Sequence, residues 1–206
     1  MPDITPTLLT QIGLTLTLSY LFGSIATAII VAKLMGMPDP RHFGSGNPGA
    51  TNVLRLGGKK AAIFTLAGDI LKGVLPVAFC IALNLPVIVV AAAALAAFIG
   101  HLYPVFFGFK GGKGVATAAG VLLAMAPLTG LIVITVWLVN AIITRYSSLS
   151  ALLAAISAPI VAWLTGQPVE ILITITLISA LLIWRHQANI QRLLAGQEPK
   201  IGQKTN

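Results

Sequence analysis

Seven apolar segments follow one another along this 206-residue chain, with only short polar connections between them. A straight helix needs about 20 apolar residues to cross the hydrocarbon core of a bilayer. In that core the backbone N–H and C=O groups must bond within the segment, which favours helices. The sequence therefore predicts an all-α integral membrane protein with a single domain over residues 1–206. The expected helices lie near Leu8–Leu34, Ala61–Leu83, Pro86–Gly100, Val115–Ala126, Leu128–Ile143, Leu149–Leu164 and Val169–Trp184.

Composition agrees with a membrane protein, since 57% of the residues are hydrophobic and only 9% are charged, against about 25% charged in soluble domains. In a soluble protein the formal net charge of +8 would suggest nucleic acid. In a membrane protein such an excess reflects topology and anionic lipid headgroups, so no nucleic-acid partner is expected. The single cysteine, Cys80, excludes an internal disulfide. The first apolar run is too long for a cleaved signal peptide and is expected to remain as a span.

The number of spans depends on residues 115–143, where Pro127 and Gly130 favour a break between two helices. With seven spans, the N-terminus and the turns near Asn84, Pro127 and Gln167 share one side and contain no Lys or Arg. The other side carries the loop and tail cations, which are Arg41, Arg55, Lys59, Lys60, Lys110, Lys113, Arg145, Arg185, Arg192, Lys200 and Lys204. By the positive-inside rule this second side is cytoplasmic. We therefore predict a seven-transmembrane-helix bundle with a periplasmic N-terminus and a cytoplasmic C-terminus, since six spans would scatter these charges.

A glycine-rich turn precedes the fourth segment, with two lysines and three glycines between Lys110 and Gly114. Glycines allow backbone N–H groups to turn toward one point, and a helix beginning near Val115 would add the positive end of its dipole. The plainer alternative is a basic turn that only fixes topology, but glycines contribute nothing to topology. The turn is therefore expected to bind an anion, most simply a phosphate.

A second glycine-rich loop, GSGNPGATN, spans Gly44 to Asn52. It satisfies the GxGxxG pattern formally, but a dinucleotide site needs a preceding strand and a βαβ unit, and a membrane segment precedes this loop. Its neutral donors and the following Arg55 suit a phosphate, which arginine can bind through two parallel hydrogen bonds. An ordinary polar turn is the alternative, and the density of glycine and amide groups favours the binding site.

Asp69 and Lys72 lie three residues apart inside the second segment and so share one helical face. Charges inside a membrane are costly and usually functional. Two interpretations stay open: a neutralising pair that helps the bundle to pack, or a support beneath the polar loops.

Two further segments carry polar residues at helical spacing. In RYSSLS, which begins at Arg145, Ser148 precedes an apolar segment and is interpreted as a helix cap. In the C-terminal region, His186, Asn189 and Arg192 are three residues apart and would lie on one side of a helix, as the wall of a site does. No nucleophilic triad and no zinc-ligand spacing is present, so neither a metal nor a cofactor is expected.

Three stretches together resemble a known family: GSGNPGATNVLR at 44–55, KGGKGVAT at 110–117 and HQANIQRLLAGQE at 186–198. They are similar to the motifs of the bacterial membrane acyl-phosphate:glycerol-3-phosphate acyltransferases (PlsY), and the resemblance covers essentially the whole chain. It implies transfer of a fatty acyl group from acyl phosphate to glycerol 3-phosphate, giving lysophosphatidic acid in the first acylation step of phospholipid biosynthesis. It also implies seven spans in the inner membrane, an active site facing the cytoplasm, and no obligate protein partner.

The resemblance assigns residues to roles. The phosphate-cradling loop consists of Ser45, Gly46, Asn47, Gly49, Thr51 and Asn52. The glycerol 3-phosphate site consists of Arg55, Lys113, Ser148, His186 and Asn189. Acyl phosphate would approach the backbone at Gly111, Gly112 and Gly114, with Lys110 beside them. Supporting residues are Asp69, Lys72, Arg192 and Glu198, and whether Glu198 acts chemically or only orders the tail stays open.

The mechanism expected from these residues is direct attack of the glycerol 3-phosphate hydroxyl on the acyl carbonyl. Lys113, Arg55 and backbone amides would stabilise the developing charge. The proton would pass to His186 or to the substrate phosphate, and Asn189 would orient the reactants. The alternatives are a transporter of anions or phosphate esters and a non-catalytic lipid-binding subunit, and the residues alone do not identify the acyl donor.

Overall fold

The computed structural model describes residues 6–203, and every regular element in that range is helical. The membrane-type helices are α1 (Pro6–Gly23), α4 (Lys59–Ala82), α5 (Val87–Leu102), α6 (Val115–Met125), α7 (Pro127–Thr144), α8 (Ser147–Leu164) and α9 (Val169–Arg185). Shorter elements are α2 (Thr27–Leu34), η1 (Pro40–His42), α3 (Ala50–Arg55), η2 (Val105–Phe107) and α10 (Gln187–Leu194). All seven predicted apolar segments are helical, which confirms the all-α prediction for the described residues. The N-terminal residues 1–5 and Lys204, which entered the predicted topology, lie outside the described range.

Within residues 6–203, five segments are long and apolar enough to cross a membrane by themselves: Leu9–Leu34, Lys59–Ala82, Val87–Phe107, Pro127–Thr144 and Ser147–Leu164. The pair α9 and α10, bent by 57°, makes a sixth if it is counted as one span. Helix α6 has only 11 residues, fewer than a straight span needs. The seven-span count and the orientation of the termini therefore stay predictions.

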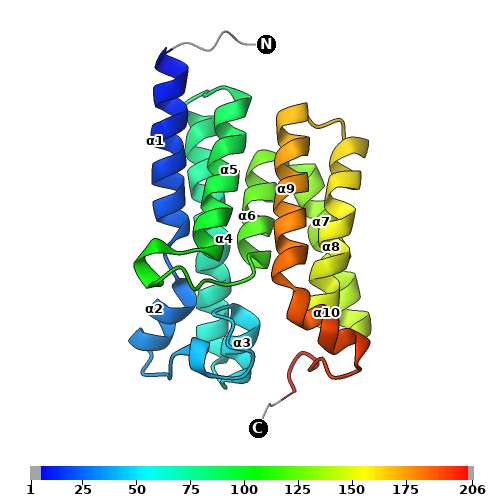
Figure 1. Ribbon diagram of the computed structural model, residues 1–206. Coiled ribbons are helices and arrows are strands. Elements are labelled where there is room, and N and C mark those ends of the chain that lie inside the picture. The colour runs from blue at the N-terminus through cyan, green and yellow to red at the C-terminus, as the bar shows by residue number, and fades with distance from the viewer. Residues whose placement is uncertain (1–5, 204–206) are drawn as a thin grey trace.

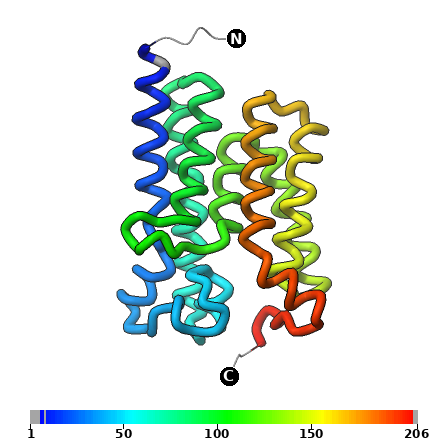
Figure 2. Tube along the Cα trace, viewed as in Figure 1, coloured from blue at the N-terminus to red at the C-terminus, as the bar shows by residue number. Residues whose placement is uncertain are grey.

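The helices form two groups with α6 between them (Figure 1). Helices α1, α4 and α5 pack together on one side, and α7, α8 and α9 pack together on the other. Helix α6 contacts both groups through α4 and α7. The tube view shows that α1 begins at one end of the bundle, whereas α10 and the tail lie at the opposite end (Figure 2).

Glycines allow close contact between two helices of the first group. A Cβ atom on Gly23 would lie 2.1 Å from the Ala97 carbonyl oxygen, and one on Gly100 would lie 2.3 Å from the Tyr20 carbonyl oxygen. Helices α1 and α5 therefore touch backbone to backbone, in the manner of membrane helices that associate through small residues.

The first apolar run is not one continuous helix, in contrast to the prediction for Leu8–Leu34. It divides between Gly23 and Thr27, where Ala26 has non-helical φ and ψ of −81° and 82°. No proline marks this break. A buried side chain from another helix stabilises it, because Lys72 Nζ donates a 2.8 Å hydrogen bond to the Ile25 carbonyl oxygen.

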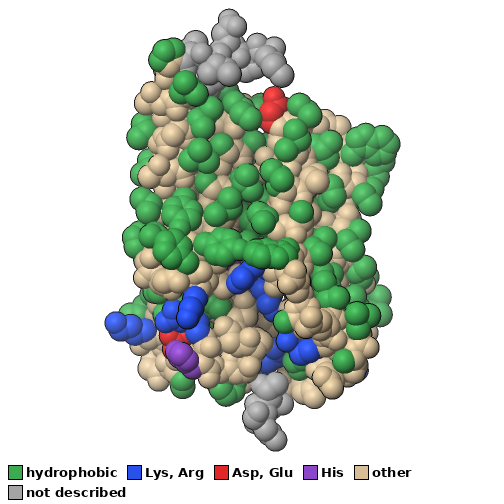
Figure 3. All heavy atoms as spheres, in the orientation of Figure 1, with side chains coloured by type: hydrophobic (Ala, Val, Ile, Leu, Met, Phe, Trp, Pro, Cys, Tyr) green, Lys and Arg blue, Asp and Glu red, His purple; other side chains and the backbone are tan. Residues whose placement is uncertain are grey.

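The surface divides along the bundle axis. In the space-filling view, hydrophobic side chains cover the upper and middle parts, and Lys and Arg gather toward the lower end (Figure 3). Large apolar side chains face outward along the helices, for example Ile142 and Ile143, which are 77% and 74% exposed. An apolar belt of this kind is what lipid contact requires. The basic end carries the polar loops described next.

Candidate active site

Glu198, in the segment after α10, is the centre of a buried polar cluster. Its carboxylate accepts hydrogen bonds from Ser148 Oγ at 2.7 Å, from Asn189 Nδ2 at 2.6 Å and from Arg192 Nε at 2.7 Å. Only 8% of the residue is exposed. Burial alone would raise the pKa of the Glu198 carboxyl, but the three hydrogen bonds lower it below its ordinary value. Glu198 is therefore ionised and joins α8, α10 and the tail.

Lys113 joins this cluster from the glycine-rich turn before α6. Its ammonium donates a hydrogen bond to the Asn189 amide oxygen. Burial lowers the pKa of Lys113 to about 8, and the nearby positive charge of Arg192 adds to the shift while Glu198 opposes it. The lysine is thus a partly desolvated cation, which interacts more strongly with an arriving anion than a hydrated one does.

His186 lies between α9 and α10 and is 2% exposed. Its Nδ1 is 2.8 Å from the Leu182 carbonyl oxygen, so Nδ1 carries the proton and Nε2 is left as an acceptor. Burial lowers the pKa of His186 to about 4, with the charge of Lys113 acting in the same direction. His186 is therefore neutral at physiological pH.

Arg55, the last residue of α3, reaches across to the tail. Its Nη2 donates a 3.1 Å hydrogen bond to the Pro199 carbonyl oxygen, whereas the buried Nε has no hydrogen-bond partner. A buried donor without a partner is costly. The guanidinium thus has donor capacity to spare for an anion.

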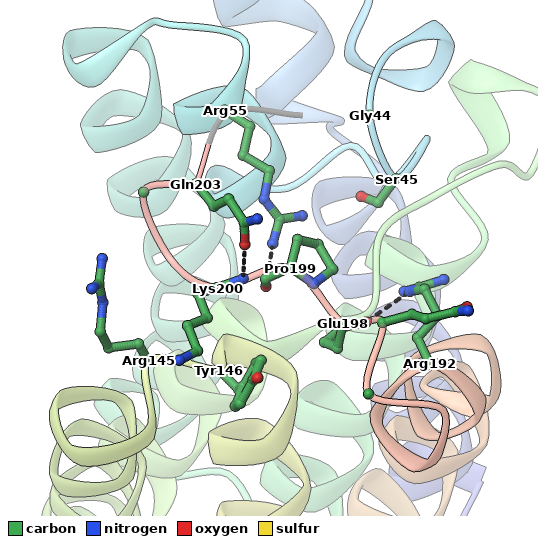
Figure 4. A pocket seen from close by; sticks show the side chains of 13 residues that line it. Gly44, Ser45, Arg55, Arg145, Tyr146, Arg192, Glu198, Pro199, Lys200 and Gln203 are labelled. Carbon is green, nitrogen blue, oxygen red and sulfur yellow. Dashed lines mark hydrogen bonds and ion pairs between the residues drawn. The ribbon is translucent and has the colours of Figure 1, made fainter. Parts of the chain in front are cut away.

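A cavity of about 1010 Å³ opens beside Arg55 and Glu198 (Figure 4). Its walls come from the first glycine-rich loop, the turn between α7 and α8, α10 and the tail. Four cations and one acid are among the lining residues, which include Ser45, Arg55, Arg145, Arg192, Glu198 and Lys200. Lys113, Asn189 and His186 are not part of these walls. Asn189 bonds directly to Glu198 and links Lys113 to the cavity wall.

Of the residues predicted in the first glycine-rich loop, some line the cavity and others hold the loop in shape. Ser45 lines the cavity, and Thr51 Oγ1 lies 3.3 Å from Ser147 Oγ at the start of α8. Asn52 is buried; its amide oxygen accepts from Ser45 N, and its amide nitrogen donates to the carbonyl oxygens of Pro40 and Phe43, just before the loop. Asn52 therefore holds the loop in shape instead of offering its amide to a ligand.

The remaining members of this loop shape its backbone. Gly46 adopts the left-handed region with φ of 67°, which favours glycine. A Cβ atom on Gly49, which precedes α3, would lie 2.8 Å from Asn47 Nδ2, so these two residues pack against each other.

Close packing against α5 requires glycine at all three positions of the second turn. A Cβ on Gly111 would lie 2.0 Å from the His101 carbonyl oxygen, and one on Gly112 would lie 2.3 Å from His101 Nε2. Gly114 has φ of 86°, and its Cβ would lie 2.3 Å from the Phe98 ring. The turn is therefore seated directly on the end of α5. Lys110 is exposed.

Arg185 holds this turn from the other side and was not predicted as a site residue. Its Nη2 donates to the carbonyl oxygens of Gly111 and Gly112 at 3.2 and 3.3 Å. Its guanidinium also lies over the Tyr103 ring, 5.7 Å from the centroid. The sequence signal for this role is only an arginine at the end of an apolar helix, which is also common as a topology determinant.

The predicted capping role of Ser148 is wrong. Helix α8 begins at Ser147 and makes no side-chain capping bond. The Ser148 hydroxyl instead donates to Glu198, whose position 50 residues later in the chain no local pattern indicates. The other predicted supporting pair, Asp69 and Lys72, forms a 2.9 Å ion pair in α4, apart from the Glu198 cluster.

Comparison with known proteins identifies the family of the chain. The sequence model of the family described as glycerol-3-phosphate acyltransferase matches residues 13–196. The chain is 57% identical over 188 residues to a glycerol-3-phosphate acyltransferase of Thioalkalivibrio sulfidiphilus, covering 91% of this chain and 92% of the relative. It is 58% identical over 191 residues to one of Paraburkholderia phymatum, covering 90% of each.

Two crystal structures of PlsY (YgiH), an integral membrane glycerol 3-phosphate acyltransferase, have the same fold. The glycerol 3-phosphate form superposes with a TM-score of 0.88 at 44% sequence identity, covering 93% of this chain and 96% of that one. The lysophosphatidic acid form gives a TM-score of 0.86 at 42% identity, covering 93% and 95%. The chain described here therefore belongs to the glycerol-3-phosphate acyltransferase family of integral membrane proteins.

Proposed function

We propose that this protein transfers a fatty acyl group from acyl phosphate to glycerol 3-phosphate, giving 1-acyl-glycerol 3-phosphate and inorganic phosphate. The reaction takes place at the cytoplasmic face of the bacterial inner membrane. The relatives are described as glycerol-3-phosphate acyltransferases, and PlsY is known in forms with glycerol 3-phosphate and with lysophosphatidic acid. The choice of acyl phosphate as donor goes beyond those descriptions.

The observation that carries the proposal is the convergence of cations on one polar cluster. Arg55, Lys113 and Arg192 come from α3, the turn before α6, and α10, yet the charges of Arg55 and Arg192 both lower the pKa of Lys113. Repelling cations that are held together need an anion to balance them. Glu198 supplies only part of that charge, and a phosphate group supplies the rest.

The chemistry of the cluster favours an activated donor. A covalent acyl-enzyme requires a nucleophile next to a base. The one cysteine of the sequence, Cys80, is buried among the hydrophobic residues of α4. Ser148 donates its hydrogen bond to Glu198, which also accepts from Asn189 and Arg192; these bonds lower the pKa of the carboxyl and make it a weak base. Acyl phosphate is already activated, so direct transfer requires no such intermediate.

In the proposed step, a hydroxyl oxygen of glycerol 3-phosphate forms a bond with the acyl carbonyl carbon, and the bond from that carbon to the phosphate oxygen breaks. Lys113 and Arg55 stabilise the charge that develops on the carbonyl oxygen and on the departing phosphate. Asn189, oriented by Glu198, fixes the position of the Lys113 ammonium.

The hydroxyl proton passes to the phosphate of a substrate. His186 has a pKa of about 4, whereas a phosphate monoester has its second pKa near about 6 and is the stronger base. His186 then holds the acceptor substrate through Nε2 instead of removing its proton.

We also propose that seven helices cross the membrane, with the N-terminus in the periplasm. One feature supports an odd number of crossings, and a second supports the orientation. Helix α1 begins at one end of the bundle while the described tail lies at the other, and the cations gather at the end that holds the tail. By the positive-inside rule that end is cytoplasmic.

The direct test uses purified protein in lipid nanodiscs with acyl phosphate and glycerol 3-phosphate. We expect lysophosphatidic acid and phosphate in equal amounts, and no product with acyl-CoA. Arg55→Gln should abolish turnover, whereas Lys60→Gln, which removes an exposed charge at the start of α4, should leave it unchanged.

Other outcomes separate the alternatives. Product from acyl-CoA alone would overturn the choice of donor. No product from either donor, together with uptake of a phosphate ester into proteoliposomes, would replace the enzyme with a transporter.

A further inference from the structure

A second buried polar cluster lies beneath the glycine-rich turn and takes no part in the proposed chemistry. It consists of Asp69 and Lys72 from α4, His101 from α5 and Thr117 from α6. Their exposed fractions are 2%, 4%, 5% and 0%. Burying ionisable side chains inside a membrane bundle costs free energy, so residues of this kind usually have a function.

The contacts in this cluster form a chain. Lys72 Nζ lies 2.9 Å from Asp69 Oδ1, and the same oxygen lies 3.6 Å from His101 Nδ1. Thr117 Oγ1 lies 3.1 Å from His101 Nδ1 and donates its own proton to the Asp69 carbonyl oxygen at 3.0 Å. Because the hydroxyl proton is already used, Nδ1 must be the donor to Thr117, which fixes the orientation of the imidazole.

The other edge of the imidazole faces the turn. A Cβ atom on Gly112 would lie 2.3 Å from His101 Nε2, so this nitrogen is in contact with the turn. The same Cβ would lie 3.3 Å from the Pro48 carbonyl oxygen, which belongs to the first glycine-rich loop. The two loops therefore meet directly above His101.

Lys72 extends the chain in the opposite direction. Its hydrogen bond to the Ile25 carbonyl oxygen stabilises the break between α1 and α2, and α2 leads into the first glycine-rich loop. The cluster is thus attached to both loops, to one through Gly112 and to the other through this break. An ion pair that only neutralised its own charges would need neither attachment.

We propose that Asp69, Lys72, His101 and Thr117 are positioning residues for acyl transfer. They hold the turn at Gly111–Gly114 through the imidazole of His101, and so set the location of Lys113. The inference rests on the proposed function and adds to it a part of the chain that touches neither substrate.

Matched threonine variants test this proposal. Thr117→Val and Thr129→Val each remove one fully buried hydroxyl from a membrane helix. Thr129 bonds to Thr165 at 2.8 Å, in the group of helices that does not carry the turn. The readouts are KM and kcat for both substrates, thermal unfolding, and hydrogen exchange of the peptide that covers residues 108–116.

We expect Thr117→Val to raise the KM for acyl phosphate about fivefold, as the loss of one hydrogen bond predicts, with a smaller change in kcat. Exchange at residues 111–114 should become faster. Thr129→Val should lower the unfolding temperature similarly but leave KM and this exchange unchanged. Thr117→Ser keeps the hydroxyl, so its KM and its exchange rate should both stay at the wild-type values. His101→Asn should behave like Thr117→Val.

Equal KM shifts in the two valine variants, or unchanged KM and exchange in Thr117→Val, would overturn the proposal. If the wild-type protein makes no product, the proposed function fails. The exchange comparison then still decides whether the cluster holds the turn. If Thr117→Val does not fold, the comparison of His101→Asn with Thr117→Ser decides the same point.

Discussion

Asn189 donates a 2.6 Å hydrogen bond from its amide nitrogen to Glu198, and this contact determines which way the amide faces. Because Nδ2 faces the carboxylate, the amide oxygen is turned to Lys113 and accepts the hydrogen bond of its ammonium. Glu198 therefore orders Lys113 without touching it. The sequence left open whether Glu198 acts chemically or only orders the tail. Its bonds to Ser148, Asn189 and Arg192 favour an ordering role, and through Asn189 that role extends to Lys113.

Replacing Glu198 with glutamine should damage both stability and activity. The amide has one acceptor oxygen for three donors and turns its NH2 group toward the others. We expect the free energy of unfolding to fall by about 1–3 kcal/mol and kcat/KM to fall at least about tenfold. Glu170→Gln, in the first turn of α9, is the control for lost charge. Equal effects of the two variants on activity would contradict this role.

Activity should fall as the pH rises through about 8, where Lys113 loses its proton. The ratio kcat/KM reports the free enzyme and should show this descending limb between pH 6 and 10. Unfolding driven by Lys113 does not explain the loss. The pKa of Lys113 lies below the ordinary value of 10.5, so between about pH 8 and 10.5 the unfolded state binds more protons at this residue, and the contribution of Lys113 to stability rises with pH.

Lys113→Arg provides the control for the pH profile. Arginine stays protonated, so the descending limb should move beyond about pH 10 even if the absolute rate is lower. A limb at the same pH in both proteins would assign the titration to another group.

His186→Asn should lower kcat by less than about tenfold. The asparagine amide nitrogen can replace Nδ1 as the donor to the Leu182 carbonyl oxygen. Removal of a general base typically costs about 10²–10⁴-fold. A loss of that size in His186→Asn, measured at saturating substrate, would make His186 the proton acceptor after all.

Gly111→Ala should unfold more easily, because its methyl group would lie 2.0 Å from the His101 carbonyl oxygen. Overpacking of this kind costs about 1–3 kcal/mol. Gly13→Ala in α1 meets nothing within 4 Å and should be neutral or slightly stabilising. Thermal unfolding of the two variants checks the difference. Equal stability would mean that the turn can move away from α5.

Hydropathy predicted the helices because lipid contact requires long apolar runs, and their residue ranges agree closely with those observed. It did not predict the break at Ser24–Ala26, since that break depends on Lys72 donating to a carbonyl group from another helix. It also could not decide the number of spans, because α6 is apolar yet short.

Glycine, amide and basic motifs predicted the site residues, but they did not predict the structural role of each residue. Asn52 resembles a ligand donor in the sequence and is a loop brace in the structure. In the sequence, Arg185 resembles a cation that only sets topology, and His101 resembles an ordinary buried histidine. In the structure both contact the glycine-rich turn. Such roles depend on contacts between residues distant in sequence, which local patterns do not encode.

The shortness of α6 has a consequence for where the reaction takes place. Eleven residues give about 16 Å of helix, roughly half of the 30 Å or so of a hydrocarbon core. The helix begins part of the way along the bundle, and the turn that carries Lys113 is attached there (Figure 1). For the proposed reaction, the water-soluble substrate must descend below the headgroups, while the acyl chain of its partner stays at its own depth in the bilayer.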